Sequence, residues 1–266
     1  MKIDLARMTK RPSKRPIVLR PIMTTAAQAD TLSAVYLRIV KAWSEGQDRI
    51  NSAYAKTLNE LQTDSADDIQ RAIDELADTI RRLVLTLTPD LRNWALGIER
   101  VQRGKWISNI MSAASVDLTT VLTPGDVEDT LQAQIEWNVS LIRDVSDETR
   151  RRIANSVFAG LQQRKPANEI AREISEAIGM ARARARRIAS DQTIKLGERL
   201  NRARQEQAGI SKFKWRHSGK LHPRSWHLAR NGKIYPWTNS GIPASDMPGV
   251  PPFCGCTAQG VVEFDE

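Results

Sequence analysis

Hydrophobic positions along the first half of the chain follow the spacing of amphipathic helices. Between residues 24 and 61, apolar side chains recur mostly at steps of three and four residues. This spacing predicts one long helix, or two if Gly46 interrupts it. The same period continues through residues 69–87, before Pro89, and again through residues 91–111. The pattern therefore predicts a helical N-terminal region.

The period resumes after the turn signal Thr123-Pro124-Gly125 and continues to about residue 142. Ser146, followed by two acidic residues, is placed to cap a helix that carries Ile153 and Val157. These signals predict a second helical region in the middle of the chain.

Two further helices are expected before residue 210. Lys165-Pro166 is a start signal, and Gly179 is a stop signal for the helix that follows. An Arg-rich helix is then expected from about Arg182 to Ala208, closing at Gly209.

The amino-acid composition changes beyond Ile210. Prolines gather between residues 236 and 252, and residues 257–264 have the composition of a strand. The sequence therefore predicts a mainly α fold, with helical N-terminal and middle regions and a small α+β C-terminal module. The expected domains are a basic extended arm at 1–20, a helical N-terminal domain at 21–122, a helical middle domain with the Arg-rich helix at 123–209, and the C-terminal module at 210–266.

Basic residues give the 266-residue chain a formal net charge of +9 and are concentrated in blocks. Residues 1–20 contain one acid, Asp4, and residues 211–245 contain none. Such blocks suit a polyanion such as DNA, because each neutralised phosphate releases a counterion. Solvated helix faces explain any single block equally well. The basic residues of the arm are Lys2, Arg7, Lys10, Arg11, Lys14, Arg15 and Arg20, and the candidate DNA-binding residues of the Arg-rich helix are Arg182, Arg184, Arg186, Arg187, Lys195 and Arg199.

The sequence shows no sign of a membrane-spanning segment or a secretory signal. No run of about 18 apolar residues occurs, so no membrane partner is expected. The first residues lack the apolar stretch of a secretory signal. With only two cysteines, too close in sequence for a comfortable disulfide, a reducing, cytoplasmic origin is expected.

Every histidine and cysteine of the chain lies between residues 217 and 256. Imidazole and thiolate are the preferred ligands of structural zinc. A small module with a thin core gains the most stability from such a bound metal. The candidate zinc ligands are His222, His227, Cys254 and Cys256. The alternative is that the histidines are hydrogen-bonding turn residues and the cysteines small buried apolar groups.

Catalytic motifs are absent from the sequence: it has no nucleophile elbow, phosphate-binding glycine loop or paired-carboxylate motif. A metal-dependent nuclease with His222 as base is the enzymatic alternative. It lacks a nearby acidic metal ligand, because the first acid after Glu206 is Asp246. We therefore expect a protein that is not an enzyme.

Three ordered motifs carry a family resemblance. They are Ala185-Arg-Arg-Ile-Ala-Ser-Asp191-Gln, then Arg224-Ser-Trp-His-Leu-Ala-Arg-Asn-Gly-Lys-Ile-Tyr235, and finally Pro251-Pro-Phe-Cys-Gly-Cys256. Through them, residues 138–266 resemble the phage head morphogenesis family, whose name-giving member is the F protein of phage Mu. Two departures stand out: Gly255 replaces the family's usual Arg, and some relatives have Cys-x-x-Cys where this chain has Arg224 and His227.

The resemblance implies a minor capsid protein in the head of a tailed bacteriophage, associated with the portal and aiding head assembly and DNA packaging or delivery. Its implied partners are the portal protein, the major capsid protein and double-stranded DNA bound without sequence preference. Its implied location is the virion, and the host cytoplasm during assembly. A protein that stabilises the capsid lattice or surface is the structural alternative.

Overall fold

The computed structural model describes residues 3–9, 15–60 and 65–264 and confirms a mainly α fold. The chain divides into two compact units that interleave along the sequence. The first unit comprises Met1–Ala29, Arg92–Gln134 and Ser190–Glu266, and the second Asp30–Leu91 and Ile135–Ala189. The domain limits expected from the sequence follow chain order instead, and they stay a prediction.

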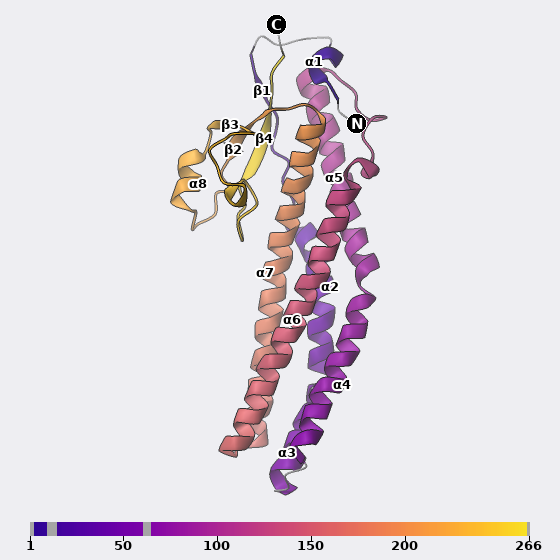
Figure 1. Ribbon diagram of the computed structural model, residues 1–266, viewed down its shortest axis with the longest axis vertical. Coiled ribbons are helices and arrows are strands. Elements are labelled where there is room, and N and C mark those ends of the chain that lie inside the picture. Colours follow the sequence, from indigo (N-terminus) through magenta and orange to yellow (C-terminus); the bar gives the residue numbers. More distant parts are fainter. Residues whose placement is uncertain (1–2, 10–14, 61–64, 265–266) are drawn as a thin grey trace. The chain divides into compact units, whose positions relative to one another are not determined.

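In the residues that the structure describes, the second unit contains helices and no strand (Figure 1). Their buried faces carry the aliphatic and aromatic residues that recur at helical spacing, including Ile39, Ile73, Ile153 and Ile174. The unit comprises α3 (Gln47–Glu60), α4 (Ser65–Leu85), most of α2 (Ala26–Glu45) and α6 (Glu128–Gln163), and the first part of α7 (Ala167–Gln207).

Buried polar bonds connect helices within this unit. The Tyr36 hydroxyl donates to Asn138 Oδ1 at 2.9 Å, and Trp43 Nε1 donates to Ser146 Oγ at 3.1 Å. Ser146 therefore lies inside α6, where its hydroxyl satisfies a buried indole. The expectation that Ser146 caps a helix is wrong, because apolar positions on both sides of it keep α6 continuous.

Two glycines that were both expected as possible helix breaks have opposite outcomes. Gly46 separates α2 from α3, and a Cβ on it would lie 2.4 Å from Leu76 Cδ2, so α4 packs close to this break. Gly179, in contrast, lies inside the uninterrupted α7. The expected stop there is wrong, because the buried stripe continues through Ile178, Ala181 and Ala185.

The first unit contains a four-stranded antiparallel sheet in the order β1-β4-β2-β3. Its strands are β1 (Ile17–Val18), β2 (Lys212–Arg216), β3 (Ile234–Pro236) and β4 (Thr257–Val262). In β2 the apolar residues Phe213 and Trp215 alternate with basic ones, so one face of the strand is buried. Figure 1 shows the sheet beside the orange C-terminal part of α7, to which Asn201 ties it by donating to the Ala258 carbonyl at 2.7 Å.

Further elements of the first unit are short, apart from α5. They are α1 (Leu5–Met8), most of α5 (Thr88–Ala114), the 3₁₀ turns η1 (Pro124–Val127) and η2 (Ala244–Asp246), and α8 (Ser225–Arg230). Pro89 lies in the first turn of α5, where its missing N–H costs nothing. No helix that the structure describes has the length and apolar character needed to cross a membrane.

The described residues of the expected arm, 3–9 and 15–20, belong to the first unit and contribute to its apolar core. Ile3, Leu5 and Leu19 are buried in the same apolar cluster as Trp106, and Ile17 pairs with Val262. Residues 5–8 form a helical turn. Among the basic residues of the expected arm, Lys2, Lys10, Arg11 and Lys14, and the side chain of Arg7, lie outside what the structure describes.

Candidate functional site

His227 is fixed in α8 with its imidazole buried, 2% exposed. The ring of Trp215, from the central strand β2, packs edge-on against it with 4.9 Å between ring centroids. Trp226 covers a second side of the ring in another edge-on contact. These aromatic contacts leave the imidazole few orientations, so its two nitrogens point in fixed directions.

Asp246 binds one of those nitrogens. Its Oδ1 lies 2.9 Å from His227 Nε2, and its Oδ2 accepts from Arg230 Nη1 at 2.5 Å. Burial favours the neutral acid, but the bonds from His227, Arg230 and Trp226 hold the pKa of Asp246 below its usual value. An ionised carboxylate only accepts hydrogen bonds, so Nε2 carries the proton and, in the neutral ring, Nδ1 presents a lone pair.

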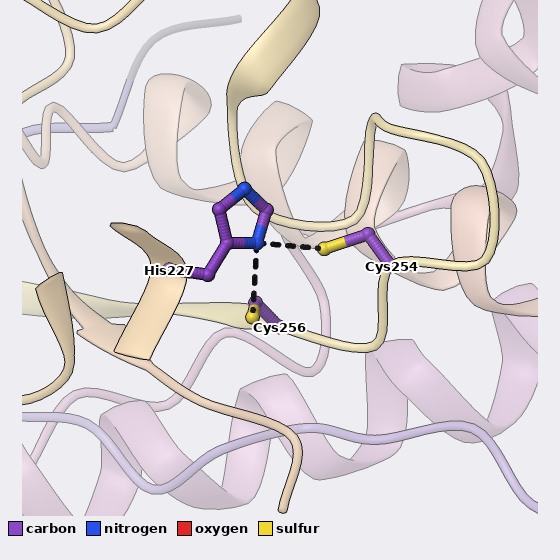
Figure 2. Close-up of side chains that lie close together, drawn as sticks. All are labelled: His227, Cys254 and Cys256. Atoms are coloured by element: carbon purple, nitrogen blue, oxygen red, sulfur yellow. Dashed lines mark hydrogen bonds between the residues drawn. The ribbon is translucent and has the colours of Figure 1, made fainter. Parts of the chain in front are cut away.

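Both cysteine sulfurs lie next to that lone pair. Nδ1 of His227 is 3.5 Å from Cys254 Sγ and 3.6 Å from Cys256 Sγ, as Figure 2 shows. The three atoms all lie within 4.8 Å of one another, and all three residues are buried. A hydrogen bond from the Cys256 thiol lowers the pKa of Cys254, and the same bond raises the pKa of Cys256. The pair therefore gives up its first proton easily and its second with difficulty.

The cysteines belong to the segment 247–256, here called the Cys loop, which α7 anchors. The buried Asp191 of α7 accepts from the Phe253 N–H at 2.6 Å, while Lys195 Nζ lies 2.7 Å from its other oxygen. Phe253 has φ +59°, a strained value for a residue with a side chain, so this anchor holds a turn that costs free energy. The anchor places Cys254 directly after the turn.

Gly255 stands between the two cysteines. A Cβ at this position would lie 2.9 Å from Ser218 Cβ and 3.0 Å from Lys220 Cε. Lys220 also donates from Nζ to the Phe253 carbonyl at 2.7 Å. The Lys220 side chain therefore occupies the space next to Gly255 and ties residues 217–221 to the Cys loop.

Of the four expected zinc ligands, the structure brings together His227, Cys254 and Cys256. It does not bring in His222, which is exposed in the segment before α8. Asp246 is the residue that the sequence interpretation missed. It is the only acid between residues 207 and 262. A single acid among many basic residues and histidines was a signal that its carboxylate binds one of them.

The expected DNA-binding residues separate into two groups. Arg182, Arg186 and Arg187 are exposed and Arg184 is half-buried; within the described ranges none of these four forms an ion pair. They are here called the Arg patch. Arg184 and Arg187 also line a hollow of about 200 Å³ on the second unit, together with Arg152. The Arg patch is therefore free to bind an anion.

Basic residues nearer the end of α7 have internal partners. Lys195 is held by Asp191, and Arg199, although exposed, donates to Gln134 Oε1 at 2.8 Å. Arg204 is fully buried, with Glu99 and Asp126 as partners. Charge counting along the sequence could not separate Arg199 and Arg204 from the Arg patch, because their partners are distant in the chain. Lys195 has its partner Asp191 one turn away on the same helix.

Part of the chain matches a family of known proteins. Residues 151–259 match the family model described as "Phage Mu protein F like protein", which confirms the resemblance drawn from the three motifs. An uncharacterized protein of Haemophilus influenzae is 27% identical over 161 residues, which are 60% of this chain and 36% of that relative. The chain thus spans about a third of the relative's length. No solved structure matches it.

Proposed function

Residues 151–259 are a phage Mu F-like head morphogenesis region, and from that premise we propose that the protein is a portal-associated minor head protein of a tailed bacteriophage. In this role it aids head assembly and the packaging or delivery of DNA, and it acts by binding, without catalysis. The observation that carries the proposal is the family match across all three motifs. Two of them meet in the structure, where Asp191 of the first binds the Phe253 N–H of the last.

The Arg patch supports a role in contacting packaged DNA. Four guanidinium groups lie within a six-residue stretch of α7 and form no ion pair with the described part of the chain, so each can bind a phosphate. The sequence beside them has no base-reading signature. Binding without sequence preference is therefore proposed, with the portal protein and the major capsid protein as the other partners. The virion is the proposed location, reached from the host cytoplasm during assembly.

DNA binding is tested on the purified full chain with random-sequence duplex DNA at several salt concentrations. The triple variant Arg182/Arg186/Arg187→Ala should bind more weakly and reduce the slope of log K against log salt by about 3. Lys41→Ala is the matched control, because Lys41 is equally exposed but paired with Glu45. Equal slopes for the wild type and the triple variant would remove DNA from the proposal.

Location in the particle tests the head role and the main alternative. Cryo-EM of intact virions should place the chain at the portal vertex in few copies. Density repeated over the capsid lattice would instead support a lattice- or surface-stabilising protein, whose basic residues bind acidic capsid faces. Metal-dependent nicking of DNA that His227→Ala abolishes would favour the nuclease, and its absence across Mg²⁺, Mn²⁺ and Zn²⁺ would support a protein that only binds.

A further inference from the structure

We propose that His227, Cys254 and Cys256 bind one Zn²⁺ ion through Nδ1 and two thiolates, with a water molecule as the fourth ligand (Figure 2). The inference rests on the geometry of the C-terminal module and is independent of the head role. It differs from the sequence expectation in its ligand set, since His222 is excluded and the fourth position is left to solvent.

Distances between the ligand atoms fit a zinc tetrahedron. With Zn–S about 2.3 Å, Zn–N about 2.0–2.1 Å and tetrahedral angles, the sulfur-to-nitrogen edge is about 3.6 Å. The two edges here are 3.5 Å and 3.6 Å. Two of the three edges therefore match a zinc tetrahedron, and the third, between the two sulfurs, is no longer than 4.8 Å.

The histidine is held in the form that a metal requires. Asp246 lies 2.9 Å from Nε2 and, in the neutral ring, accepts its proton, so the lone pair of Nδ1 faces both sulfurs. Carboxylate partners of this kind orient zinc-bound histidines and increase their basicity. Arg230 in turn fixes the carboxylate and lies 5.1 Å above the Trp215 ring.

Zinc suits this site better than harder or redox-active metals. Two thiolates and an imidazole are soft and intermediate ligands, and two negative charges balance a divalent cation. The three side chains are at most 3% exposed, so the protein shields the ligand atoms from bulk solvent. No fourth His, Cys, Asp or Glu of the described chain reaches the cluster, so an exogenous ligand completes it. The ion would join α8 to the Cys loop and stabilise a module with a small core.

Elemental analysis of the full chain, purified without a polyhistidine tag or chelator, tests the proposal. We expect about one zinc ion per chain, and after removal of zinc, Co²⁺ should give the charge-transfer absorption of a thiolate-bound tetrahedral ion. Cys254→Ser and Cys256→Ser should lose stoichiometric zinc, while His222→Ala should keep it. Asp246→Ala should keep all three ligands yet bind zinc about 10- to 100-fold more weakly.

The Co²⁺ titration of the wild-type protein keeps the test valid even if the cysteine variants do not fold. A folded wild-type chain without stoichiometric zinc that also gives no thiolate–cobalt band would overturn the proposal. Intact mass showing a Cys254–Cys256 disulfide in protein isolated from a reducing cytoplasm would overturn it as well.

Discussion

Arg204 and Glu99 form a buried ion pair, in which Arg204 Nη2 lies 2.9 Å from Glu99 Oε1 and the two side chains are 0% and 2% exposed. The pair joins α7 to α5 across the first unit. Arg204 also donates to the Thr123 carbonyl at 2.9 Å and lies 3.4 Å from Asp126. A charge buried this deeply is stable only while its partners remain.

Removal of one partner should therefore be costly. Glu99→Gln is expected to lower the free energy of unfolding by about 3 kcal/mol, because the buried guanidinium then keeps one carboxylate, Asp126 at 3.4 Å, in place of two. Urea denaturation followed by circular dichroism measures it. The control is Glu128→Gln, which breaks a surface pair with Arg92 and should cost less than about 1 kcal/mol. Equal losses in the two variants would contradict the structural role of Arg204.

Asp191 should control the order of the Cys loop. Asp191→Ala removes a charged acceptor of the Phe253 N–H, a bond of about 1.5–3 kcal/mol, so amide exchange at residues 253–256 should accelerate about 10- to 100-fold. Hydrogen exchange with mass spectrometry measures the change. Asp117→Ala is the control, because that carboxylate is exposed and accepts from its neighbour Thr119. Unchanged exchange in the Cys loop of Asp191→Ala would show that another contact holds the turn.

The helices could be predicted from the sequence because each buries one apolar stripe, and residues such as Ile153 and Ile174 lie where the period places them. Local stop and cap signals were less informative. Gly179 and Ser146 have the right residue types for helix ends, yet both lie inside long helices. Packing of the stripe outweighs a glycine or a serine, each of which costs about 1 kcal/mol or less in a helix.

The candidate site could be predicted only as a set of residue types. His and Cys residues in one module indicated His227, Cys254 and Cys256, but spacing alone could not exclude His222. Whether His222 reaches the cluster depends on the path of the chain before α8, and the spacing of apolar residues does not specify that path. The supporting acid Asp246 was missed because it lies 19 residues from His227 and reaches it only through the path of the loop between them.

Glu198 should make stability depend on pH. Burial raises the pKa of Glu198 to about 8, against 4.5 for the ordinary group. Between these values the folded chain holds a proton that the unfolded chain releases, so stability falls as pH rises through this window, by at most about 1.4 kcal/mol per pH unit. In Glu198→Gln, which stays neutral, that part of the fall should vanish.

Urea denaturation of the two proteins between about pH 5 and pH 8 separates this contribution from those of other groups. The difference in unfolding free energy between variant and wild type should shift in favour of the variant as pH rises. A difference that stays constant would show that Glu198 is ionised throughout, with the bond from the Ala258 N–H, at 3.2 Å, sufficient to hold its charge.

Gly179 tests the continuity of α7, and the buried Gly160 of α6 serves as the comparison. Gly179 is exposed and a Cβ there would meet nothing within 4 Å, so Gly179→Ala should stabilise the protein by about 0.5–1 kcal/mol if the helix runs through this position. Gly160 of α6 is buried, and a Cβ on it would lie 2.4 Å from Ile170 Cδ1. Gly160→Ala should therefore destabilise the protein by about 1–3 kcal/mol. Thermal unfolding of both variants measures the two signs, and a loss of stability in Gly179→Ala would mean that the helix ends there, as the glycine alone suggests.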